Sequence, residues 1–100
     1  MRRGTTPTYS FTLPAGMKLR DFTAAYLTFS QSGHTVLEKT INELEATEKG
    51  FRFFLSQADT LCFKPGPVYI QFRARTLDGT AVASDIISAV AQGVLKDGEI

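Results

Sequence analysis

The chain has 100 residues, of which 43% are hydrophobic, and a formal net charge of +1. A chain of this length folds as one domain and buries roughly 60–70% of its unfolded surface, which is enough for one core. The near balance of charge excludes proteins that hold nucleic acid or membranes through a strongly positive surface. We therefore expect a single domain over residues 1–100, with an ordered core over 5–95 and flexible ends at 1–4 and 96–100.

The compartment is indicated by cysteine usage and by the N-terminal residues. Cys62 is the only cysteine, so the fold must hold by packing and hydrogen bonds without an intrachain disulfide. Residues 1–7 are basic and then polar rather than apolar, which is not the pattern of a secretory signal. No stretch approaches the roughly 20 apolar residues of a membrane-spanning helix. The expected location is the cytoplasm of the producing cell, with no membrane partner.

The N-terminal half predicts three strands. Residues Thr8–Leu13 and Ala25–Gln31 alternate between apolar and polar side chains, as half-buried strands do. Ser32-Gly33 is a turn of the kind that joins antiparallel neighbours, and His34–Ile41 reads as the returning strand, although its leucine and isoleucine spacing also fits a helix. The predicted inward residues are Tyr9, Phe11, Leu13, Ala25, Leu27 and Phe29.

The middle of the chain combines a strand with turn signals. The acidic stretch 42–50 is locally helix-friendly, but a two-stranded continuation ending in a Lys49-Gly50 turn suits its neighbours better. Phe51–Leu55 predicts a strand that turns Phe51, Phe53 and Leu55 inward. Ser56 and Asp59 have the spacing of a capping box and predict one short helical turn between two sheets. Lys64–Pro67 then predicts a type II turn.

The C-terminal part contains the clearest strand, Val68–Arg75, which turns Val68, Ile70, Phe72 and Ala74 inward. Asp78-Gly79 is a strong hairpin signal that leads into a strand over 80–86. Residues 86–95 fit a strand or a helix, and their β-branched side chains and Gly93 favour the strand. About seven short strands with regular turn signals predict an all-β fold, an immunoglobulin-like antiparallel sandwich with one short helical turn, or alternatively a small barrel.

No constellation of residues supports catalysis or metal binding. His34 is the only histidine and lies beside a turn, without a spacing that would pair it with a nucleophile. One histidine and one cysteine do not complete a zinc site, and Cys62, between Leu61 and Phe63, is expected to be a small buried hydrophobe. Glu43 and Glu45 read as a solvated acidic face. We expect a noncatalytic protein without a cofactor or a metal.

Two sets of residues are candidates for binding. The polar face of the clearest strand carries Tyr69, Gln71, Arg73 and Arg75, an aromatic side chain beside two guanidinium groups that could hold bases, sugars or acidic partners. The alternative is a face that is solvated or covered by a neighbouring chain, and the net charge gives nucleic acid no support. Residues 86–95 are apolar on both sides, so this segment is either sandwiched or an edge that pairs with another copy. The residues of that self-association strand are Ile86, Ile87, Val90 and Val94.

Three motifs in order carry a resemblance: Lys64-Pro65-Gly66-Pro67-Val68-Tyr69-Ile70-Gln71, the hairpin Thr76-Leu77-Asp78-Gly79-Thr80, and Val94-Leu95-Lys96-Asp97-Gly98-Glu99-Ile100. The chain resembles small immunoglobulin-like domains encoded by phages and prophages of Gram-positive bacteria, such as the N-terminal domain of the baseplate upper protein.

The resemblance implies a noncatalytic structural role in tail or baseplate assembly, in the virion or in the host cytoplasm, with other virion proteins and the chain itself as partners. It carries over no functional residue. Baseplate proteins continue into a further region where this chain stops, so the resemblance suggests a freestanding connector. The competing hypothesis is a module that binds carbohydrate on a cell surface by stacking sugars on Tyr26, Phe54 or Tyr69.

Overall fold

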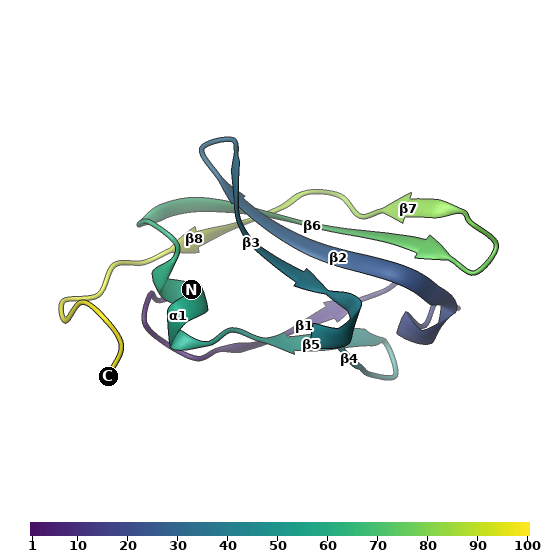
Figure 1. Ribbon diagram of the computed structural model, residues 1–100, viewed down its shortest axis with the longest axis horizontal. Helices are drawn as coiled ribbons and strands as arrows, with labels where there is room; N and C mark the ends of the chain where they lie inside the picture. The colour runs from purple at the N-terminus through teal and green to yellow at the C-terminus, as the bar shows by residue number, and fades with distance from the viewer.

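The computed structural model describes residues 1–100 as two antiparallel sheets packed face to face (Figure 1). The molecule is elongated, with extents of 47 × 26 × 19 Å. The smaller sheet has the strand order β1-β5-β4, and the larger has the order β3-β2-β6 followed by β7 and β8, which both pair with β6. The strands are β1 (Thr8–Thr12), β2 (Phe22–Gln31), β3 (His34–Thr40), β4 (Glu45–Ala46), β5 (Gly50–Phe54), β6 (Gly66–Thr76), β7 (Ala81–Ala83) and β8 (Ile87–Ala91).

The strand order is that of an immunoglobulin-like sandwich. Variable-type immunoglobulin domains place strands B, E and D in one sheet and G, F, C and C′ in the other. The orders β1-β5-β4 and β7-β6-β2-β3 follow this arrangement, so the predicted all-β sandwich is confirmed. The structure has eight strands where about seven were expected, because β7 and β8 occupy successive parts of one edge position beside β6.

The core lies between the sheets and is dominated by phenylalanine. Phe51 stacks on Phe11 with ring centroids 5.0 Å apart, and Phe72 lies 5.0 Å from Phe51. The inward residues predicted for β2 and β5 are confirmed as buried. Tyr9 is an exception: although its ring lies 5.8 Å from that of Phe53, it stays exposed on the edge strand β1. The buried apolar residues are Leu13, Leu19, Phe22, Ala25, Leu27, Phe29, Leu44, Phe51, Phe53, Leu55, Phe63, Val68, Phe72, Ala74 and Ala91.

Two of the predicted connections are confirmed. Ser32 and Gly33 have φ values of 52° and 77°, the two positive values that a type I′ hairpin needs between β2 and β3. The Ser56 hydroxyl accepts a hydrogen bond from the Asp59 N–H at 3.0 Å, and the Asp59 carboxylate accepts one from the Ser56 N–H at 2.9 Å. This box opens the helix α1 (Gln57–Leu61), which carries the chain from the smaller sheet to the larger.

The predicted type II turn at Lys64–Pro67 is wrong. Gly66 has a φ of 134°, far from the roughly 80° of that turn, and is the first residue of β6. The loop is shaped instead by the distant side chain of Gln31. Its amide accepts a hydrogen bond from the Lys64 N–H at 2.9 Å and donates to the Lys64 and Pro67 carbonyls at 2.7 and 3.3 Å. The Gln31–Lys64 contact joins residues 33 positions apart, and it shapes this loop in place of the type II turn that the local sequence predicted.

The stretch between β3 and β5 is only partly the two-stranded continuation that was predicted. Two short 3₁₀ turns flank strands of the larger sheet, one at Leu19–Asp21 before β2 and one at Ile41–Glu43 after β3. Of the acidic stretch, only Glu45–Ala46 pairs with β5. The residues before this pair form the 3₁₀ turn Ile41–Glu43, and the residues after it form a loop. The helical propensity of this stretch therefore produces only a single turn.

The N-terminal residues lie against the last strand. Arg2 forms a parallel bridge with Gln92, whose N–H donates to the Met1 carbonyl at 2.7 Å. The Arg3 N–H donates to the Gln92 carbonyl at 2.9 Å. The ends at 1–4, for which the sequence predicted flexibility, therefore take part in main-chain pairing beside β8. None of the helices has the length and apolar character of a membrane span.

Candidate binding surfaces

The outer face of the larger sheet carries the residues predicted to bind a ligand. Tyr69, Gln71, Arg73 and Arg75 all belong to β6 and alternate with its buried residues, so they share this face. The strand register places Tyr26 of β2 directly opposite Arg73 and Ala24 opposite Arg75. The sheet therefore brings a second exposed tyrosine beside the two arginines.

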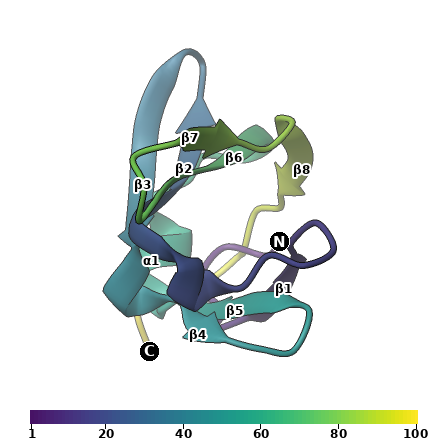
Figure 2. The same cartoon turned by 90° about the vertical axis from the view of Figure 1, so that its right-hand side faces the viewer.

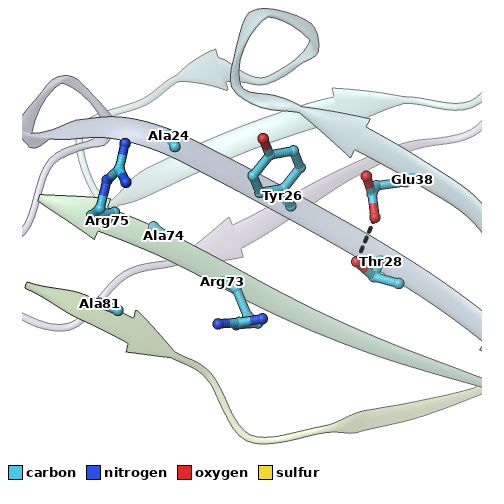
Figure 3. A pocket seen from close by; sticks show the side chains of 8 residues that line it. All are labelled: Ala24, Tyr26, Thr28, Glu38, Arg73, Ala74, Arg75 and Ala81. Atoms are coloured by element: carbon cyan, nitrogen blue, oxygen red, sulfur yellow. Dashed lines mark hydrogen bonds between the residues drawn. The ribbon is translucent and has the colours of Figure 1, made fainter.

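An open hollow of about 700 Å³ surrounds the two arginines (Figure 3). Arg75 lies between Ala24 of β2 and Ala81 of β7, and Arg73 lies between Tyr26 and Ala83. Alanine side chains are too short to cover a guanidinium group, and neither arginine forms an ion pair with a carboxylate. We call this site the outer hollow; its lining residues are Ala24, Tyr26, Thr28, Glu38, Arg73, Ala74, Arg75 and Ala81.

The outer hollow contains two of the four predicted residues. Arg73 and Arg75 line the outer hollow, whereas Tyr69 and Gln71 do not. The Gln71 side chain donates to the Ser84 carbonyl at 3.0 Å, and so it holds the break between β7 and β8 rather than facing a ligand. Sequence reasoning missed Glu38, which accepts a hydrogen bond from the Thr28 hydroxyl at 3.3 Å on the same face. Glu38 reaches this face through the pairing of β2 with β3, and the sequence alone does not reveal which residues of the two strands lie opposite each other.

The predicted self-association strand is an exposed edge of the larger sheet. Residues 87–91 form β8, so the strand interpretation of this segment is confirmed over its first half. Ile86, Ile87, Val90 and Val94 are 64%, 46%, 57% and 37% exposed. β8 pairs with β6 on one side, and on the other only Met1–Arg3 reach its last residues. These apolar side chains thus border an edge that is free over most of its length.

The single histidine and the single cysteine are both exposed. His34 is exposed at the start of β3, as expected for a residue beside the hairpin. The prediction that Cys62 is buried is wrong. It is exposed at the end of α1, where its thiol donates to the Ala58 carbonyl at 3.2 Å. The helical turn directs Thr60 and Phe63 into the core and leaves Cys62 outside. No group of three or more His, Cys, Asp or Glu side chains is placed to hold a metal ion.

The two carboxylates of the acidic stretch are occupied by local contacts. A hydrogen bond from the Thr40 N–H, together with the Lys39 ammonium 3.4 Å away, holds the pKa of Glu43 below its ordinary value. A hydrogen bond from Arg52 lowers the pKa of Glu45. Both groups are therefore held in the ionised form, in contacts that fix β4 and the turn before it. This arrangement lacks a carboxyl group with a raised pKa, which a general acid needs near neutral pH.

The chain was compared with protein-family models, curated proteins and solved structures. None of them matches it. The likeness to phage immunoglobulin-like domains therefore rests on the three sequence motifs alone. The structural indications of function are the binding surfaces described above.

Proposed function

We propose that the chain is a noncatalytic interaction module that binds other proteins through the free β7–β8 edge, as a component of a phage tail or baseplate. The observation that carries the proposal is the difference between this edge and the edges formed by β3 and β4. The phage context comes from the resemblance of the turn motifs. Partners would be other virion proteins and further copies of the chain.

The opposite edge of the larger sheet is protected against pairing. Lys39 lies on the inward side of β3, directly across from the buried Leu27, and its ammonium is held by Asp59 at 2.9 Å. An inward-pointing lysine on an edge strand opposes the addition of a further strand. In the smaller sheet, the β4 edge is only two residues long and carries Glu45. Short, charged edges of this kind are typical of proteins that avoid edge-to-edge association.

The β7–β8 edge has no such protection. Residues 81–91 contain a single charged residue, Asp85, and end in the exposed apolar side chains of β8. The Val90 carbonyl accepts a hydrogen bond from the N-terminal ammonium at 2.7 Å, so the main-chain groups of Val90 point away from β6. Because these directions alternate along a strand, the N–H and C=O of Ser88 point to the same free side. This edge offers both main-chain groups and apolar side chains to a partner strand.

The proposal is tested by blocking the edge. Ser88→Pro removes the outward N–H without touching the ladder to β6, and Val90→Lys adds a charge beside it. We expect both variants to lose self-association, measured by light scattering over a concentration series, and Glu48→Lys, in the exposed loop between β4 and β5, to retain it. The virion role is tested by mass spectrometry of gradient-purified tails and baseplates. If the chain is absent from these particles at every stage of assembly, the virion role is wrong.

The outer hollow supports a second candidate function, the binding of carbohydrate on a cell surface. Tyr26 offers a ring for stacking against a sugar, and the unpaired Arg73 and Arg75 suit sugars that carry carboxylates. Phe54 and Tyr69 are also exposed but lie outside the hollow. Glycan-array binding that is lost in Tyr26→Ala and kept in Tyr69→Ala would support this function. An array on which the native chain binds nothing would exclude it.

A further inference from the structure

An apolar groove opens between β1 and β7, on the side of the sandwich where the two sheets are not joined by a strand. Its volume is about 580 Å³, and Asp85 is its only ionisable lining residue. Figure 2 shows β8 in the upper layer and β1 in the lower layer on the same side of the molecule, away from α1. We call this site the β1–β7 groove; its apolar lining includes Phe11, Leu13, Met17, Phe22, Phe72 and Val82.

Both borders of the β1–β7 groove are free strand edges. The Leu13 N–H donates to the Lys49 carbonyl, so the alternate residues Ser10 and Thr12 direct their main-chain groups away from β5. On the other border, the Ser84 N–H donates to the Phe72 carbonyl, so Ala83 directs its main-chain groups away from β6. An extended segment in the groove would therefore find hydrogen-bonding partners on each side and apolar side chains beneath.

The chain already fills the neighbouring part of this opening with an extended segment. Met1–Arg3 run beside the end of β8 and form three main-chain hydrogen bonds to Val90 and Gln92. The same side of the sandwich is left open next to β7, where the groove lies. One half of the opening is thus covered by an N-terminal segment that pairs with the chain beside β8, and the other half has the shape and chemistry to accept a strand.

We propose that the β1–β7 groove accepts residues 93–97 of a second copy of this chain as an added strand. This inference deepens the proposed function, because it names one contact through which copies would assemble. The tail segment 93–97 contains Val94, Leu95 and Lys96, and Leu95 is fully exposed. Within its own molecule, the Lys96 ammonium donates only to the adjacent Asp97 carbonyl.

The chemistry of the tail segment complements that of the groove. In an extended segment Val94 and Lys96 share one face, so an apolar side chain would lie on the apolar floor and the lysine would lie beside the carboxylate that borders it. Asp85 has no ion-pair partner in its own molecule. The tail is held in place by side-chain contacts, one of which is a hydrogen bond from the Arg2 guanidinium to the Gly93 carbonyl at 2.7 Å. The others include the ion pair between Arg3 and Asp97 at 3.8 Å and the hydrogen bonds between Gln57 and Ile100. Such contacts are weak and do not oppose release of the segment.

Within one molecule the tail segment lies against Arg3 and Gln57 rather than in its own groove. The tail leaves the sandwich at one end of the long axis, while the groove lies toward the end that carries the β6–β7 hairpin (Figure 1). Transfer of the tail to another copy would join two molecules. The exchange closes a pair where it is reciprocal, and builds a ring or a filament where it is not.

A charge swap tests this contact. We expect Asp85→Lys and Lys96→Asp each to weaken assembly by about tenfold in sedimentation equilibrium, and the double variant to recover the native affinity. Glu99→Lys, in the same tail but outside the segment, is the matched control and should assemble like the native chain. Circular dichroism confirms that each variant is folded. A native chain that stays monomeric at high micromolar concentration, or a double variant without recovery, overturns the inference.

The design separates this inference from the proposed function. Val90 lies on the outer face of the larger sheet, opposite Pro67, and does not line the groove. If Val90→Lys abolishes assembly while both charge variants assemble normally, the tail contact is wrong and the edge proposal stands. If the charge swap behaves as expected while Val90→Lys assembles normally, the tail contact beside β7 stands and the β8 part of the edge is not an assembly surface.

Discussion

The Lys39 ammonium, on the inward side of the edge strand β3, lies 2.9 Å from the Asp59 carboxylate at the start of α1. Both side chains are largely buried, at 12% and 20% exposure. The same carboxylate caps α1 through the Ser56 N–H, so one acidic group ties the larger sheet to the helix that crosses between the layers. The pair therefore stabilises the fold and also keeps β3 from acting as a pairing edge.

Removing the charge of Asp59 should destabilise the protein measurably. In Asp59→Asn the side chain keeps its size, but Lys39 loses its closest anionic partner and the cap is weakened. We expect the free energy of unfolding to fall by about 1–3 kcal/mol in chemical denaturation. The control is Asp97→Asn, which breaks only the exposed pair with Arg3 and should cost less than about 1 kcal/mol. Equal losses in the two variants would contradict the role assigned to Asp59.

The same pair predicts a pH dependence. Burial alone would raise the pKa of Asp59, but the hydrogen bond from the Ser56 N–H and the Lys39 ammonium outweigh it and hold this pKa below its ordinary value. The unfolded chain therefore takes up a proton first, at about pH 4. The stability contributed by Asp59 is present above that pH and is lost as the pH falls through the lower folded pKa.

At the alkaline end the sign is reversed. Burial alone would lower the pKa of Lys39, but its hydrogen bond and attraction to Asp59 raise it overall. Its contribution is complete below about pH 10 and is lost as the pH rises through the folded pKa.

Denaturation at a series of pH values tests the acid side. The difference in unfolding free energy between the native chain and Asp59→Asn should shrink below about pH 4. A difference that is constant from pH 2 to pH 7 would refute the assignment.

The sequence predicted the parts of the fold that depend on local pattern. Alternation in β2 and β6 identified Leu27, Phe29 and Phe72 as core residues because side-chain direction in a strand has a period of two. The Ser56–Asp59 box was predictable because both of its hydrogen bonds lie within one helical turn. The Gly66 conformation was not, because it depends on Gln31, which comes from another strand.

The candidate surfaces show the same division. Alternation placed Arg73 and Arg75 on one face, but the hollow around them comes from Ala24 and Ala81, which reach it only through the β2–β6 and β6–β7 registers. The sequence of one strand does not reveal which residues of the neighbouring strand lie opposite it. The pairing of Met1–Arg3 with the end of β8 joins residues about ninety positions apart and has no local signal.

Cys62 should react as an exposed thiol. Because its side chain lies outside the core at the end of α1, we expect a disulfide-exchange reagent to modify it completely in the folded protein, without denaturant. Cys62→Ser should leave the unfolding free energy within about 0.5 kcal/mol of the native value. Labelling that begins only in denaturant would show that the thiol is buried.

Gly50 lies against the main chain of the neighbouring strand and gives a sensitive test of packing in the smaller sheet. A Cβ atom at this position would overlap the Phe11 carbonyl oxygen and lie 2.8 Å from the Leu13 nitrogen. Because both neighbours are main-chain atoms, of β1 and of the residue that follows it, they cannot rotate away, and Gly50→Ala must push β1 from β5. We expect a loss of about 1–3 kcal/mol or more in the free energy of unfolding.

The control for Gly50→Ala is Gly93→Ala. There the nearest atom to the new Cβ is a Pro65 ring carbon at 3.6 Å, an ordinary van der Waals distance, and the backbone has no positive φ. The unfolded state is stiffened equally by either alanine, so the difference between the two variants isolates the clash with β1. Since Phe11 stacks on Phe51 and lines the β1–β7 groove, displacement of β1 should also weaken any assembly through that groove. Equal stability of the two variants would mean that β1 packs more loosely on β5 than the structure shows.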